Sequence, residues 1–107
     1  MAQLITILWR DIPAQVTARE GRRKVSIQLD DRFQIAIDKA AVLAGKRTTD
    51  EYLGEWHRTT VDCGDDLQAE VDTAAVSLEA EFTEQVLSAF VGRGGFRHDD
   101  TGESGTP

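Results

Sequence analysis

The side chains best suited to chemistry in this sequence lie between residues 57 and 66. Cys63 is preceded by His57 and Asp62 and is followed by Asp65 and Asp66. A thiol with a nearby imidazole can act as a nucleophile with its base, and the same side chains are metal ligands. Because a zinc site needs about four ligands with recognisable pair spacing, we expect no metal and no cofactor. We also expect no catalytic residue, and a small enzyme that uses Cys63 or His57 is an alternative.

Basic side chains are concentrated around a predicted hairpin turn. Arg19, Arg22, Arg23 and Lys24 flank Gly21, a residue that readily adopts a positive φ. The planar guanidinium group suits carboxylates and phosphates. Two interpretations stay open: the turn grips an anionic partner, or its charges are solvated or paired with the acidic long helix.

Two tryptophans each lie close to an arginine in the sequence. Trp9 precedes Arg10, and Trp56 lies two residues before Arg58. Large aromatic side chains beside arginine are enriched at binding hot spots, but an arginine stacked on an indole also suits the edge of a core. The candidate binding surface therefore consists of Trp9, Arg10, Arg22, Arg23 and Trp56.

The composition excludes several classes of protein. The chain has 107 residues, of which 40% are hydrophobic and 29% charged, so we expect one globular domain. No apolar run reaches the roughly 18 residues of a membrane helix, and the N-terminus lacks the basic region of a secretory signal. A single cysteine suits a reducing cytoplasm. A net charge of −7 disfavours nucleic acid as a partner.

Charge is divided unevenly between the two halves of the chain. Residues 1–47 carry nine Lys/Arg and five Asp/Glu, whereas residues 48–107 carry three and fourteen, giving net charges of +4 and −11. The two halves can complement each other within one fold, or an acidic face can meet a basic partner.

Hydrophobic periodicity predicts three strands near the N-terminus. Residues 3–10 are β-branched and apolar on both faces, which is typical of a central or covered strand. We expect Pro13 to interrupt the sheet, with a second strand over 14–19. Residues 23–29 alternate as a half-buried antiparallel strand does, and 57–62 are a candidate fourth strand.

Helices are predicted over 31–45, 50–56, 65–82 and 84–91. Asp30 is a good N-cap for the first, Thr49 caps the second, and a break near Thr83 separates the last two. Ile35 and Val42 lie seven residues apart on the outer side of the first helix and form a contact surface if neighbours extend them. Residues 93–107 lack the apolar residues that ordering requires, so we place the domain at 1–92, followed by a disordered, acidic and glycine-rich tail.

Several of these motifs together resemble one bacterial family. They are Trp9 to Val16, Gly21 to Arg23, Arg32 to Gln34 with Ala36 to Asp38, and Tyr52-Leu53 with Trp56. The run over about residues 3–82 is similar to the virulence factor domain, which also forms the N-terminal part of conserved virulence factor C proteins. Asp30-Asp31 departs from the proline-containing helix start of that family. The resemblance implies no active site, and it associates stand-alone members with folate- and corrinoid-dependent methyl transfer.

The sequence thus predicts a two-layer α+β domain with the order ββ-β-α-α-β-α. A three- to four-stranded antiparallel sheet is covered by the helices over 31–45 and 65–82. We expect a non-enzymatic cytoplasmic interaction or accessory module with an unknown protein partner. An accessory subunit of a folate/corrinoid-dependent methyl-transfer enzyme is the alternative, and the sequence does not fix the oligomeric state.

Overall fold

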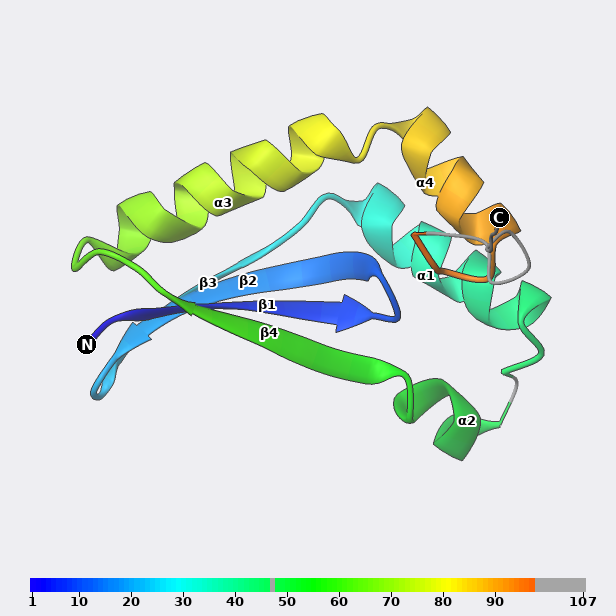
Figure 1. Ribbon diagram of the computed structural model, residues 1–107, viewed down its shortest axis with the longest axis horizontal. Helices are drawn as coiled ribbons and strands as arrows, with labels where there is room; N and C mark the ends of the chain where they lie inside the picture. Colours follow the sequence, from blue (N-terminus) through cyan, green and yellow to red (C-terminus); the bar gives the residue numbers. More distant parts are fainter. Residues whose placement is uncertain (47, 98–107) are drawn as a thin grey trace, which may run out of the picture.

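Four antiparallel strands form one sheet in the spatial order β3-β2-β1-β4 (Figure 1). The computed structural model describes residues 1–46 and 48–97. The strands are β1 (Gln3–Trp9), β2 (Ile12–Glu20), β3 (Arg23–Gln28) and β4 (Trp56–Asp62). The α+β class, the meander of the first three strands and the fourth strand are confirmed. As its apolar residues on both faces predicted, β1 is a central strand.

Pro13 lies inside β2 rather than between two strands, so the prediction that it interrupts the sheet is wrong. Ile7 pairs with Gln15 and Leu8 pairs with Pro13, which leaves Ala14 as an extra residue in β2. At such a bulge one backbone N–H is not needed for a hydrogen bond to the neighbouring strand, so a proline, which has no N–H, is tolerated there. The second strand therefore begins at Ile12 instead of at residue 14.

Each helix begins after a polar side chain that accepts a hydrogen bond from the first turn. The helices are α1 (Asp31–Leu43), α2 (Thr49–Leu53), α3 (Leu67–Glu81) and α4 (Glu84–Gly92). Asp30 caps α1 as predicted, and Thr83 separates α3 from α4 by capping the latter. The cap of α2 is Thr48 rather than Thr49, because Thr48 and Glu51 form a reciprocal capping box. No helix in the described part of the chain is long and apolar enough to cross a membrane.

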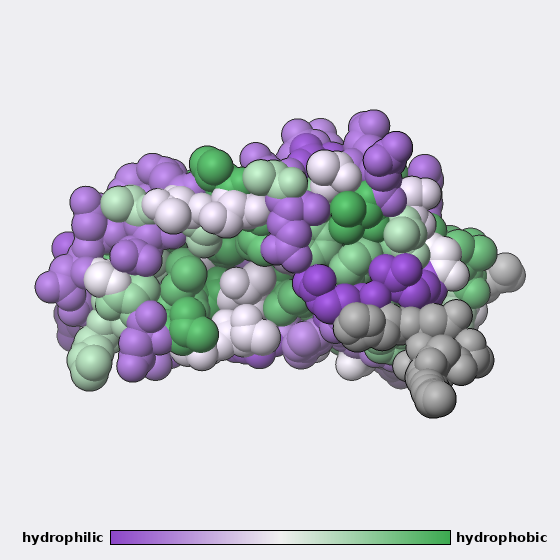
Figure 2. All heavy atoms as spheres, turned by 45° about the horizontal axis from the view of Figure 1, so that its top comes forward, coloured by the Kyte–Doolittle hydropathy of each residue, from purple (hydrophilic) through white to green (hydrophobic). Residues whose placement is uncertain are grey.

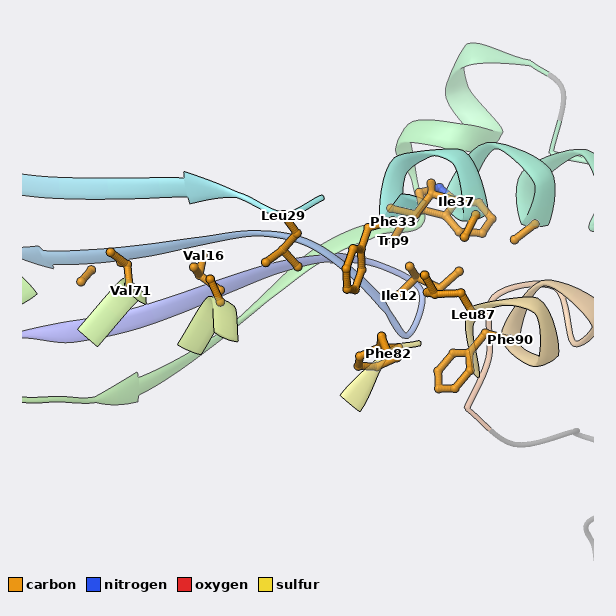
Figure 3. Close-up of a cluster of buried hydrophobic side chains, with 14 of the residues drawn as sticks. Trp9, Ile12, Val16, Leu29, Phe33, Ile37, Val71, Phe82, Leu87 and Phe90 are labelled. Atoms are coloured by element: carbon orange, nitrogen blue, oxygen red, sulfur yellow. The ribbon is translucent and has the colours of Figure 1, made fainter. Parts of the chain in front are cut away.

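Helices α1, α3 and α4 bury the core against the sheet, chiefly against β2. α3 runs over β2 and β3, and α1 packs against β2 and α4. Figure 3 shows Phe33 and Ile37 of α1 facing Leu87 of α4, with Ile12 of β2 nearby. Phe82, between α3 and α4, makes edge contacts with Phe33 and Phe90, with ring centroids 5.9 and 5.1 Å apart. These aromatic contacts join α1, α4 and the end of α3 to one another.

The half of the sheet formed by β1 and β4 has little helical cover. The residues of β4 from His57 to Asp62 are all exposed, and Val61 retains 57% of its accessible surface. By contrast, Val16 and Ala18 of β2, under α3, are fully buried. Figure 2 shows hydrophobic surface exposed beneath the band of residues along α3. β2 is therefore a core strand, whereas β4 lies at the surface.

The contacts of the domain continue past the predicted boundary at residue 92. Gly95 N donates to Phe90 O at 2.8 Å, and Gly95 O accepts from Asp11 N at 2.9 Å. Arg97 N donates to the Asp11 carboxylate at 2.7 Å. Residues 93–97 therefore pack on the β1–β2 turn, because their glycines and Phe96 fit closely against it. The remainder of the predicted tail, 98–107, lies outside the described residues.

Gly95 provides a test of this packing. It has φ +99°, and a Cβ atom there would lie 2.9 Å from Cζ3 of the fully buried Trp9 indole. We expect Gly95→Ala to lower the free energy of unfolding by about 1–3 kcal/mol, through backbone strain and overpacking. Gly92→Ala is the matched control, since a methyl group at that position would meet no atom within 4 Å. Urea denaturation measures both, and equal stabilities of the two variants would contradict the packing described.

Candidate functional site

Trp9, predicted as a surface anchor, is a core residue. Its side chain has 0% exposure, and its Nε1 donates to the carbonyl of Tyr52 at 2.8 Å. The indole also stacks on the Tyr52 ring with a centroid separation of 5.9 Å. A partner could reach this side chain only by opening the domain, so the structure corrects its assignment to the binding surface. The core interpretation of this tryptophan is the one that the geometry supports.

Arg10 is likewise used within the fold. Its guanidinium donates to Gly94 O at 2.9 Å and to the Glu55 carboxylate at 3.2 Å, and it stacks on Phe96 at 4.4 Å. Only 10% of the side chain is exposed. Both terminal nitrogens and the flat face of the guanidinium are engaged, and Nε, which has no partner, is buried, so Arg10 is poorly placed to grip an anion of a partner. Trp56 is half-buried and makes an edge contact with Tyr52 at 6.0 Å.

The two hairpin arginines lie at the opposite end of the sheet. The β2–β3 pairing ends with Glu20 opposite Arg23, whereas Trp9 pairs with Ile12 at the other end of β2. About 26 Å separates the two ends, from the rise of a strand over eight residues. The five predicted residues therefore do not form one surface.

Arg22 and Arg23 differ in their surroundings at the hairpin. Arg23 donates to Glu20 at 2.8 Å and to the carbonyl of Asp65 at 3.4 Å, while 64% of its side chain stays exposed. Arg22 is exposed and makes no ion pair with a described residue. Within the described chain, neither arginine pairs with a carboxylate of α3. The hairpin thus keeps cationic groups available to an anion.

Cys63 and His57 are not brought together. They lie at opposite ends of the extended β4, which places them about 20 Å apart. Desolvation raises the pKa of the Cys63 thiol, and the charges of Glu70, Asp62 and Asp65 raise it further. The thiol is therefore protonated at neutral pH and a poor nucleophile. His57 forms a hydrogen bond through Nε2 with the carbonyl of Arg10. Within residues 1–46 and 48–97, no three potential ligands gather to hold a metal.

A groove between α1 and α4 is a concave surface that the sequence analysis did not predict. A cavity of about 370 Å³ lies between the two helices. Its apolar lining comes from Ile35 and Ala36 of α1 and from Leu87 and Val91 of α4. We call this surface the α1–α4 groove. Arg32 and Lys39 of α1 and Glu84 of α4 also line it, so the groove carries two cationic groups and one anionic group.

An exposed apolar patch continues the groove along α1. Val42 and Leu43 line an adjoining cavity of about 440 Å³ together with Val91. Ile35, Val42 and Leu43 are 51%, 60% and 66% exposed. The sequence pointed to Ile35 and Val42, and the structure supplies the neighbours that extend them. The sequence analysis did not include Leu43 and Val91 in this surface, because whether they are exposed beside Ile35 and Val42 depends on how α4 packs on α1.

Comparison with known proteins identifies one family. Residues 7–91 match the model of the family described as "Virulence factor". Separate searches of curated proteins and of solved structures each gave no match. The family match covers most of the folded chain, and it confirms the resemblance predicted from the motifs.

Glu55 offers a test of the contacts of Arg10. A hydrogen bond from Arg10 is the largest influence that lowers the pKa of the Glu55 carboxyl, and Lys46 at 3.4 Å lowers it further, against desolvation. Because the folded state holds the ionised Glu55 carboxylate more favourably than the unfolded state does, it gains stability at pH values above the ordinary pKa of 4.5. This gain is lost as the pH falls below 4.5 and the carboxylate becomes protonated. We expect Glu55→Gln to cost about 1 kcal/mol at pH 7 and less at pH 3.

Chemical denaturation at pH 7, 5, 4 and 3 measures this difference. Glu81→Gln is the control, because its one ion pair, with Arg97, is half exposed on both sides. A Glu55→Gln penalty that is equal at pH 7 and pH 3 would show that the charge of Glu55 does not contribute to the stability of the corner around Arg10.

Proposed function

The chain belongs to the virulence factor family, and we propose that it is a cytoplasmic, non-enzymatic module that binds a partner protein in the α1–α4 groove. The observation that carries this proposal is the continuous apolar surface of Ile35, Val42, Leu43 and Val91 at the groove. Apolar patches of this kind on small proteins are typical of sites that bind other proteins. The distance between Cys63 and His57 supports a role without chemistry.

The spacing of the exposed side chains suits an amphipathic helix of the partner. Ile35 and Val42 are seven residues apart on α1, which corresponds to two turns and about 10 Å. A helix that docks in a groove places its own apolar anchors at i and i+7, over the same distance. Leu87 and Val91 of α4, four residues apart, form the other wall. The groove therefore matches about two turns of a bound helix.

The charges at the groove favour an acidic residue in the bound helix. Lys39 lies between Ile35 and Val42 in α1, is exposed, and has no ion-pair partner among the described residues. A carboxylate midway between two apolar anchors of the partner can reach it, and such rim charges contribute mainly to specificity and association rate. We propose Arg22 and Arg23 as a separate contact for anionic groups, at the far end of the sheet.

Comparative co-purification tests the groove. The full chain is used as bait with Ile35→Glu, Val42→Glu and the control Val76→Glu. Val76 is 68% exposed on α3, away from the groove. A charge in an apolar contact should weaken binding at least tenfold. We expect one protein to be retained by the wild type and by Val76→Glu and to be lost with the two groove variants, and titration calorimetry with that purified protein then measures the loss.

The identity of the captured protein separates the remaining alternatives. A folate- or corrinoid-dependent methyl-transfer enzyme would favour the accessory-subunit function that the resemblance implies. Retention of the same protein by Ile35→Glu, Val42→Glu and the wild type would exclude the α1–α4 groove as its binding site.

A further inference from the structure

β4 is an edge strand that no other segment of the described chain pairs with on its outer side. It has seven residues, contains no proline or glycine, and pairs with β1 without a register shift. Its residues from His57 to Asp62 are exposed, and no helix of the described chain covers it. Natural proteins normally protect long edges with prolines, bulges or covering segments, because an open edge pairs with other strands. An unpaired edge of this length is therefore a site for another strand.

The hydrogen bonds to β1 determine which residues of β4 face outward. Cys63 N donates to Ala2 O at 3.1 Å, and Arg10 N donates to Glu55 O at 3.0 Å. Antiparallel ladders alternate, so the odd-numbered residues of β4 direct their main-chain groups to β1. The even-numbered residues direct theirs away from the sheet: Trp56, Arg58, Thr60 and Asp62. A pairing strand must join its own outward residues to these four.

We propose that β4 pairs antiparallel with β4 of a second copy of this chain, with Thr60 opposite Thr60 on the two-fold axis. The backbone hydrogen bonds between the two β4 strands form only in symmetric registers that place even-numbered residues opposite even-numbered ones. In the register centred on Thr60, Arg58 of each copy lies opposite Asp62 of the other. The two cross-strand ion pairs come from residues that make no ion pair within the described chain, and opposite charges at such positions stabilise a sheet.

The neighbouring registers are less favourable. Centring on Thr59 places Asp62 opposite Trp56, and centring on Arg58 places two guanidinium groups opposite each other, which is repulsive. Centring on Val61 places Asp62 opposite Thr60 and gains no ion pair. Charge complementarity therefore selects the Thr60 register, and with it a second copy as the partner.

The other edge of the sheet does not offer the same pairing. β3 carries the cations Arg23 and Lys24 and no carboxylate, so a symmetric β3 pair gains no ion pair. Pairing through β4 produces one eight-stranded sheet with the α3 helices of both copies on the same side. On that side Val61, which is 57% exposed, comes to lie opposite Thr59 of the second copy. The dimer thus covers apolar surface that a single copy leaves exposed.

The pairing has the size of a concentration-dependent interface. One ladder between two edge strands buries an area at the low end of specific interfaces, so we expect a Kd on the order of 10 µM. Sedimentation velocity of the full chain at concentrations from about 5 to 500 µM, a range chosen to bracket that Kd, should show a monomer–dimer equilibrium. A chain that stays monomeric throughout this range would overturn the proposal.

A charge-swap cycle tests the register. Arg58→Asp and Asp62→Arg each place like charges opposite each other twice, and each should raise the dimer Kd by about tenfold or more. The double variant R58D/D62R restores both ion pairs, and should restore the Kd to within about threefold of the wild type, allowing for the usual context dependence of surface pairs. Circular dichroism confirms that each variant is folded. Single variants that leave the dimer Kd unchanged, or a double variant that stays monomeric, would contradict the Thr60 register.

A disulfide trap gives an independent readout. Thr60→Cys in a Cys63→Ser background places two thiols opposite each other on the two-fold axis, within the Cα separation that a disulfide spans. Oxidation should yield a covalent dimer, whereas Ser77→Cys, exposed on α3, in the same background should not. Equal cross-linking at the two positions would reflect random collision and would overturn the proposed interface.

Discussion

The packing around the β1–β2 turn is the constraint on which the rest of the domain depends. Trp9 is sealed from solvent and bonded to Tyr52, and Arg10 links Glu55 to Gly94. Arg10 holds a φ of +53°, a value that a non-glycine residue adopts only when surrounding contacts compensate its cost. Through this turn, α2, the start of β4 and the residues after α4 are all held against the same end of the sheet.

This internal use of Trp9 and Arg10 determines where binding can occur. Residues whose side chains are buried and used for contacts inside the domain cannot also recognise a partner. The surfaces left for recognition are those that the turn does not reach: the groove on the outer side of α1 and α4, the hairpin at the other end of the sheet, and the edge of β4. These are separate places, so different contacts can form at the same time.

The local features were predictable from the sequence, whereas the burial and long-range contacts of individual side chains were not. The strand alternation at Val25 and Ile27, the cap Asp30 and the break at Thr83 depend on neighbours a few residues away, and they were predicted. The burial of Trp9 and Arg10 depends on Gly94 and Gly95, which lie more than 80 residues further along the chain. No local pattern contains that information, so the candidate site mixed core residues with surface residues.

The open half of the sheet follows from the path of the helices. α3 crosses β2 and β3, and α1 and α4 pack at the end of the sheet. Within the described chain, β1 and β4 have no helix along their length and contact α2 at one end, where Tyr52 meets Trp9 and Trp56. A chain of this size buries only about two-thirds of its unfolded surface, so some apolar surface must stay exposed. Part of that surface is gathered on one helix: Ile35, Val42 and Leu43 are all exposed along α1, where a segment of another chain can cover them together.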